Sequence, residues 1–219
     1  MKKSVLFLAV LLLFSLTACS GGGGAPTPSG AVTDGQQGEP AQPETLRQSG
    51  TADGADANIL VVYFSATGNT AGVAEQVARA AGADLVELIP ARPYTDADLN
   101  YSDDSCRANR EQNDAHARPE ISGQIENMDA YDIVLIGHPI WWGQEPRILD
   151  TFMESYDFSG KTLANFCTSG GSGIRTSTEN LRALSPDANW LEGRRFDSGA
   201  SLEEAQEWLH DIGIITADA

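Results

Sequence analysis

Short apolar runs alternate with amphipathic stretches along most of this chain. Residues 59–64, ILVVYF, are apolar or aromatic throughout, which is typical of a strand buried on both faces of a parallel sheet. After a hydroxyl-rich turn, Val73, Ala74, Val77 and Ala80 recur near the 3.6-residue helical period. The pattern therefore predicts a strand, a tight loop and a helix in succession.

The same alternation continues to the C-terminus. Further strands are predicted at residues 84–89, 132–137 and 161–167, with a short edge strand at 190–196. Helices are predicted at 145–156 and 174–184, near 103–113 within the polar stretch 94–128, and from Ser201, where Ser201 and Glu204 form a capping box. This order predicts an α/β fold, a doubly wound open parallel five-stranded sheet with strand order 2-1-3-4-5.

The N-terminal segment has the features of a bacterial export signal. Lys2 and Lys3 precede the apolar residues 5–16, and Leu16-Thr17-Ala18-Cys19 resembles a lipobox. We expect a lipoprotein signal peptide at 1–18 and lipidation of Cys19, which would attach the protein to the membrane by its acyl chains. The alternative is a plain secretory signal with a coincidental cysteine.

A flexible tether and one domain are expected to follow the signal. Residues 19–57 are rich in Gly, Pro, Ser, Ala, Thr and Gln and have no periodic apolar pattern, so they cannot bury a core. Residues 58–219 have the size of a single domain. The expected location is therefore outside the cytoplasm, lipid-anchored to the bacterial cell membrane.

Composition excludes some partners. The chain has 14 basic and 31 acidic residues, a net charge of −17, which disfavours nucleic acid and attachment to anionic lipid by charge alone. Acidity fits a basic partner or simply a solvated surface.

Cys106 and Cys167 could pair after export, although the spacing does not require it and Cys167 looks like the buried end of a strand. No metal site is expected.

The loop after the first strand has the composition of an anion site. Ser65-Ala66-Thr67-Gly68-Asn69-Thr70 lies at a helix start, where free N–H groups and the helix dipole attract an anion. It contains no lysine or arginine, and neither GxxxxGK[ST] nor GxGxxG is present. A neutral, hydroxyl-rich loop suits a single phosphate monoester. The alternative is an ordinary turn with Asn69 as the N-cap.

This loop resembles the [ST]-x-T-G-x-T pattern of the flavodoxin family, which holds the phosphate of FMN. Residues 93–114 and 137–148 are similar to flavodoxin-like proteins found as bacterial lipoproteins. The resemblance implies noncovalent FMN and a redox role without naming a substrate.

Ser198-Gly199-Ala200-Ser201 resembles a covalent flavin-attachment core, but Arg195 stands where such sites carry an acidic residue, so noncovalent binding is expected.

Two more loops are expected to hold the flavin ring, because ligands of open α/β sheets bind at the carboxyl ends of the strands. An apolar surface for the ring is expected from Pro139, Ile140, Trp141, Trp142 and Gly143, and polar backbone groups for its edge from Thr168, Ser169, Gly170, Gly171, Ser172 and Gly173. The alternatives are core packing of the tryptophans and a flexible turn at 168–173.

His138 is the one candidate catalytic residue in these loops. It could deliver a proton or stabilise the charge of reduced flavin, and the alternative is a loop side chain with all its hydrogen bonds satisfied. The 168–173 loop contains no aromatic residue, whereas flavodoxins that act only as carriers usually have one there. One ring face is therefore expected to be open, or covered by Tyr101 or another residue of 94–128.

The sequence is compatible with three functions. The first is a reductase that passes electrons from a reduced donor to a quinone or another small oxidant. The second is an electron carrier that docks to a membrane redox partner. The third is a nonredox lipoprotein that binds FMN or another ligand.

Overall fold

The computed structural model describes residues 57–216. The predicted signal peptide, the lipidation site at Cys19 and all but the last residue of the predicted tether lie outside the described residues, so they stay predictions. Within 57–216, none of the helices has both the length and the apolar character needed to cross a membrane.

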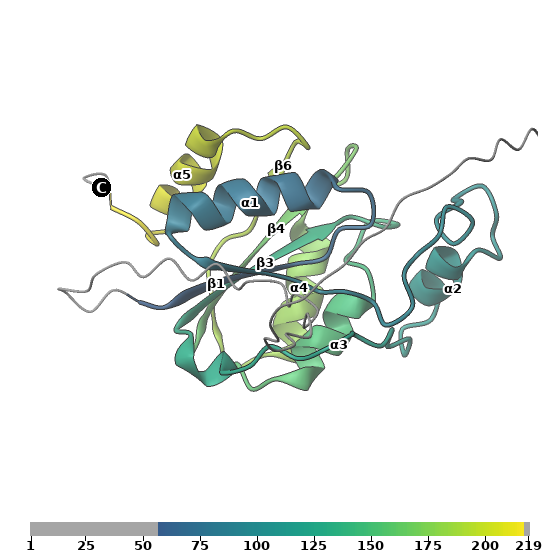
Figure 1. Ribbon diagram of the computed structural model, residues 1–219, viewed down its shortest axis with the longest axis horizontal. Helices are drawn as coiled ribbons and strands as arrows, with labels where there is room; N and C mark the ends of the chain where they lie inside the picture. Colours follow the sequence, from purple (N-terminus) through teal and green to yellow (C-terminus); the bar gives the residue numbers. More distant parts are fainter. Residues whose placement is uncertain (1–56, 217–219) are drawn as a thin grey trace, which may run out of the picture. The chain divides into compact units, whose positions relative to one another are not determined.

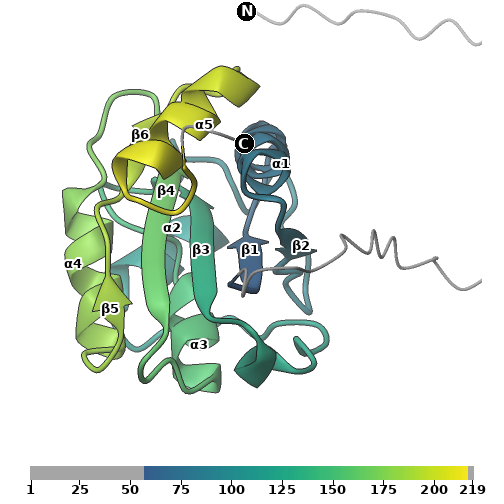
Figure 2. The ribbon, with the colours of Figure 1, turned by 90° about the vertical axis from the view of Figure 1, so that its left-hand side faces the viewer.

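A parallel sheet forms the centre of the domain (Figure 2). Its strands are β1 (Ile59–Tyr63), β2 (Asp84–Glu87), β3 (Ile133–Pro139), β4 (Thr162–Thr168), β5 (Asn189–Trp190) and β6 (Arg194–Phe196). The order is β2-β1-β3-β4-β5, with β6 also paired to β4, and every pairing is parallel. The predicted fold class and strand order are confirmed.

The edge strand predicted at residues 190–196 is wrong in one respect, because it is two short strands rather than one. β5 and β6 both pair with β4, and residues 191–193 separate them. A Cβ on Gly193 would lie 2.5 Å from the backbone oxygen of Asn165. The two backbones therefore approach closely between the two strands, where only glycine fits.

Helices cover both faces of the sheet. The covering helices are α1 (Asn69–Ala81), α3 (Ile148–Ser155), α4 (Arg175–Leu184) and α5 (Leu202–Asp211), and α2 spans Arg107–Asn113. Figure 1 shows α1 and α5 on one face and α3 and α4 on the other. Each face has its own apolar core, around Phe166 and Trp208 under α1 and α5 and around Phe64 and Phe152 under α3.

Most predicted elements are present with shifted ends. The helix predicted at 145–156 begins at Ile148 and ends at Ser155, and the Leu149 amide donates to the Pro146 carbonyl in a turn over residues 146–149 at its start. The capping box of Ser201 and Glu204 is confirmed at the start of α5. The short helix expected near 103–113 is α2, which Figure 1 shows apart from the four helices that cover the sheet.

Gly137 is required for the packing of the central strands, and this requirement generates a stability prediction. A Cβ at this position would lie 2.4 and 2.6 Å from two ring atoms of Phe166 and 3.1 Å from the Cβ of Tyr63. Gly137→Ala should lower the free energy of unfolding by about 1–3 kcal/mol through overpacking, measured by urea denaturation.

Gly72 supplies the matched control. It lies inside α1, and a Cβ there would meet nothing within 4 Å. Gly72→Ala should leave stability unchanged or raise it by about 0.5–1 kcal/mol, because alanine is the better helix former. Equal effects of the two substitutions would contradict the assigned role of Gly137.

Candidate functional site

The loops after β1, β3 and β4 meet around one cavity of about 610 Å³, within the usual range for small-molecule sites. Its lining residues are Ala66, Thr67 and Asn69 from the first loop, Pro139, Ile140 and Trp141 from the second, Thr168, Ser169 and Gly170 from the third, and Tyr101, Arg195, Asp197 and Ser198. The three loops were expected to converge because parallel strands end at the same edge of the sheet.

The first loop leaves the start of α1 open to an anion. Gly68 occupies the N-cap position with φ 85°, and no side chain caps the helix. Asn69 is the first helical residue rather than the N-cap, and its Nδ2 donates to Thr67 Oγ1 over 3.3 Å. The amides of the first turn therefore have no side-chain acceptor from a cap, and the first turn carries no acidic residue that would repel an anion.

Thr70 joins the first loop to the third instead of facing the cavity. It is buried, and its Oγ1 lies 2.8 Å from Oγ1 of Thr168. This hydrogen bond fixes the distance between the start of α1 and the end of β4. Ser65, Gly68, Trp142, Gly143, Gly171, Ser172 and Gly173, which the sequence also indicated, are likewise not among the residues that line the cavity.

The two tryptophans of the second loop have different environments. Trp141 and Gln144 exchange two backbone hydrogen bonds of 2.9 and 3.1 Å, so Trp142 and Gly143 form the centre of a two-residue turn. Both have positive φ, 48° and 83°, as type I′ turns require. Such a conformation is unfavourable for a bulky residue, so the backbone at Trp142 is strained.

This turn separates the two indole rings. Trp141 is buried and packs edge-on against Phe64 and Tyr94, at 5.6 and 5.2 Å between ring centroids. Trp142 is exposed and packs against Tyr101 at 4.8 Å. Trp141 thus combines core packing with a place in the cavity wall. A flat surface made of both indoles, as the sequence suggested, does not form.

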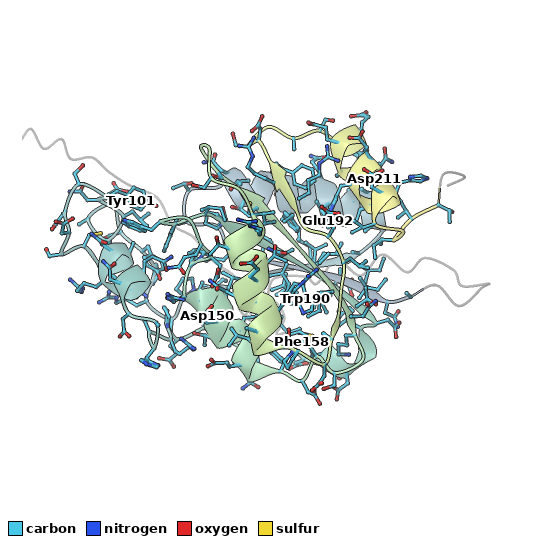
Figure 3. All side chains as sticks on the ribbon, turned by 180° about the vertical axis from the view of Figure 1, so that it is seen from behind. Tyr101, Asp150, Phe158, Trp190, Glu192 and Asp211 are labelled. Atoms are coloured by element: carbon cyan, nitrogen blue, oxygen red, sulfur yellow. The ribbon has the colours of Figure 1, made fainter. Side chains whose placement is uncertain are left out.

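Tyr101 reaches the cavity from the segment that contains α2, where the sequence placed a candidate cover for the ring. It lines the cavity and is half exposed, and Figure 3 shows it near one end of the molecule, on the same side as α2. Gln112 of α2 anchors this segment, because its Nε2 donates to the carbonyls of Trp141 and Glu145, both over 3.0 Å. No pattern in the sequence indicated this contact.

His138 is enclosed in the core. Its Nδ1 lies 3.0 Å from the Pro139 carbonyl and its Nε2 lies 3.2 Å from Nδ2 of Asn165. Since the carbonyl can only accept, Nδ1 carries the proton and Nε2 accepts from the amide. Burial lowers the pKa of His138 to about 4, so the ring is neutral at pH 7. This placement corresponds to the satisfied side chain and not to a proton donor at the cavity.

Three cavity residues from the end of the sheet were not predicted as part of the site. Arg195 lies on β6, and Asp197 and Ser198 follow this strand. A guanidinium N–H of Arg195 donates to the Ser169 carbonyl over 3.2 Å. The position of Asp197 and Ser198 after a strand at the carboxyl edge was the available signal, but the edge strand was predicted as one piece and its end was not considered as part of the site.

A cluster of buried charged residues lies behind the second loop. Glu145 is fully buried and accepts from Nδ2 of Asn180 at 3.1 and 3.2 Å. Arg147 pairs with Asp150 at 3.0 Å. Oε1 of Gln112, Nε of Arg147 and Oδ1 of Asp150 have no hydrogen-bond partner. Burial, aided by the charge of Asp150, raises the pKa of Glu145 to about 8, so Glu145 is largely protonated at neutral pH.

The two cysteines of the domain are free and buried, so the disulfide considered from the sequence does not form. Cys167 lies at the end of β4, as its pattern indicated, and burial raises the pKa of its thiol to about 12. Within 57–216, no group of three or more His, Cys, Asp or Glu side chains is placed to hold a metal ion.

Comparison with known proteins identifies relatives across the whole domain. Residues 58–212 match the family described as flavodoxin. A protein from Bacteroides eggerthii DSM 20697, provisionally described as a flavoprotein, is 46% identical, with 71% of this chain and 98% of that chain covered and a TM-score of 0.68. Its counterpart from Bacteroides uniformis ATCC 8492 is 42% identical, with 70% and 98% covered and a TM-score of 0.68.

A more distant likeness concerns the fold alone. A flavoprotein from Lactobacillus acidophilus NCFM, crystallised in complex with FMN, is 23% identical, with 64% of this chain and 93% of that chain covered and a TM-score of 0.54. No match to a curated protein was found.

The buried carboxyl of Glu145 generates a prediction about pH. Its pKa is about 8 in the folded protein against an ordinary value of 4.5, so the folded state binds more protons than the unfolded state between these values. Stability should therefore fall as pH rises through this window, by at most about 1.4 kcal/mol per pH unit. Glu145→Gln, which resembles the protonated acid, should flatten the fall, as measured by urea unfolding at pH 5.5, 7 and 8.5.

Glu179→Gln is the matched control, because Glu179 is exposed on α4. It should leave the pH dependence of the wild type intact. Parallel pH profiles for the wild type and the Glu145 variant would refute the assigned protonation state.

Proposed function

This chain is a member of the flavodoxin family, and we propose that its domain binds one FMN noncovalently in the cavity at the ends of β1, β3 and β4. The observation that carries the proposal is the meeting of an uncapped helix start with two loops that suit an aromatic ring. A phosphate at the start of α1 and a ring between the second and third loops would both be accommodated. A flavoprotein of the same fold was crystallised with FMN.

The residues present fit a phosphate monoester at one end of this cavity. Thr67 and Asn69 line it, and Gly68 has the left-handed conformation that turns the chain into α1. The phosphate would accept from the amides of the first turn and from hydroxyl donors, with the helix dipole favouring its charge. A single phosphate needs less neutralisation than a triphosphate, so a loop without lysine or arginine is sufficient.

The other walls of the cavity fit a flat ring. Trp141, Ile140 and Pro139 provide apolar surface, and Tyr101 lies at the mouth. Ser169 and Gly170 offer backbone groups for the polar edge of the ring. Bound FMN would supply reversible electron transfer, while these residues orient the ring and limit the access of water to it.

We favour a reductase that passes electrons from a reduced donor to a quinone or another small oxidant. The support is the third loop, which brings no aromatic side chain over the ring, and the exposure of Tyr101, which leaves the mouth accessible. A carrier that docks to a membrane redox protein is the second candidate, supported by the acidic charge, which would attract a basic partner. Attachment to the membrane through Cys19 would suit either role and stays a prediction of the sequence.

Thr67 allows a test of the cofactor and of its orientation. Thr67→Ala should weaken FMN binding by roughly 10-fold to 100-fold, because one hydrogen bond to a charged group contributes about 1.5–3 kcal/mol. Riboflavin lacks the phosphate, so its affinity should not change. Dissociation constants come from the quenching of flavin fluorescence, and Thr176→Ala, an exposed substitution on α4, serves as the control. Equal losses for the two ligands would reject the phosphate site.

Reduction kinetics separate the candidate functions. The FMN-loaded protein is mixed anaerobically with NADH or NADPH while the flavin absorbance is followed. A reductase should bleach rapidly and recover its colour when a quinone is added. Slow bleaching together with stepwise one-electron photoreduction would indicate a carrier instead, and a flavin that resists reduction would reject both.

A further inference from the structure

Arg195 is the one cationic side chain among the residues that line the cavity, within the part of the chain that the structure describes. The first loop, residues 65–70, has no charged residue, and the protein as a whole is strongly acidic. Arg195 is therefore a single positive charge beside an uncharged loop in an acidic protein. Its position follows from the last strand of the sheet and not from any motif in the loops.

The alternation of β6 directs this arginine toward the cavity. Successive residues of a strand point to opposite faces. Arg194 pairs with Glu207 of α5 at 3.0 Å and Phe196 is buried under the same helix. Arg195, which lies between them in the sequence, therefore points away from α5, toward the loop that follows β4.

The guanidinium is oriented by the loop predicted to hold the polar edge of the ring. Nη1 of Arg195 donates to the Ser169 carbonyl over 3.2 Å, while Nη2 lies 3.5 Å from Oδ1 of Asp197. The Asp197 side chain is 85% exposed, so this ion pair is well solvated and weak. Arg195 itself is 39% exposed, and its guanidinium has further N–H donors for a ligand in the cavity.

We infer that Arg195 stabilises the negative charge that the ring gains on reduction, an inference that rests on the proposed binding of FMN. This interaction would raise the reduction potential of the bound cofactor. When FMN gains two electrons from a donor and one proton from solvent, its ring becomes an anion. A cation beside the ring binds this form more tightly than the neutral oxidised ring. The arginine offsets locally the opposing effect of the acidic surface.

A different role for the same charge would be neutralisation of the phosphate. The polar contacts favour the ring, because Arg195 donates to Ser169 of the third loop and, in the described structure, forms no hydrogen bond with Thr67 or Asn69 of the first loop. The two roles predict different results. A phosphate partner changes FMN affinity and spares riboflavin, whereas a ring partner changes the affinity of the reduced form relative to the oxidised form.

The test measures midpoint potentials of the FMN-loaded protein by anaerobic titration with dithionite in the presence of reference dyes. Arg195→Gln should bind reduced FMN about tenfold more weakly relative to oxidised FMN, which lowers the two-electron midpoint by about 30 mV. Arg195→Lys keeps the charge and should retain most of the wild-type potential. Arg79→Gln removes the same charge from the far end of α1, outside the cavity, and should leave the potential unchanged.

Affinities of oxidised FMN and riboflavin for each variant complete the experiment. An unchanged potential in Arg195→Gln would overturn the inference while leaving FMN binding intact. A loss of FMN affinity with riboflavin affinity and potential unchanged would assign the arginine to the phosphate. A wild-type protein that binds no flavin would overturn the proposed function itself and the inference with it.

Discussion

The parallel register of β1, β3 and β4 is the constraint on which the candidate site depends. Tyr63, Gly137 and Phe166 lie side by side in this register. The three strands therefore end at one edge of the sheet, and the loops that follow them line one cavity. The register also requires a glycine between two aromatic residues, because the Phe166 ring occupies the space that a side chain on Gly137 would fill. The same strand register therefore determines both the packing of the core at Gly137 and the convergence of the three loops.

Polar groups inside the domain position the second loop at some cost in stability. Gln112 bridges the carbonyls of Trp141 and Glu145, and His138 holds the carbonyl of Pro139. Buried polar atoms without partners nearby show that this arrangement is not optimal for stability alone. A turn that holds Trp142 at positive φ adds to the cost. Such costs are typical of functional loops, whose geometry is selected for a ligand.

Charge is distributed unevenly between the site and the rest of the protein. The acidic composition sets a negative background, while the proposed phosphate position would rely on backbone amides and the helix dipole. Among the described residues that line the cavity, Arg195 is the one cation. In the proposed complex, short-range hydrogen bonds would hold the phosphate, while a single nearby charge would act on the ring.

The sequence by itself determined the fold class and the strand order, and it indicated the loop at residues 65–70, part of which lines the cavity. Apolar runs and helical periodicity are local properties, and the order of connections leaves few topologies for a parallel sheet. It also located the loops at residues 138–144 and 168–173, because every loop at the carboxyl edge is a candidate. The interruption of the edge strand at residues 191–193, where Gly193 lies close to Asn165, was not evident from any local pattern.

Only the tertiary structure decided how individual side chains are used. It separated Trp141 from Trp142 through a two-residue turn, buried His138 among Asn165 and Pro139, and turned Thr70 toward Thr168. It brought Tyr101 and Arg195 to the cavity from segments far apart in the chain. Side-chain direction and burial arise from contacts between distant segments, and a sequence pattern reports only on neighbours along the chain.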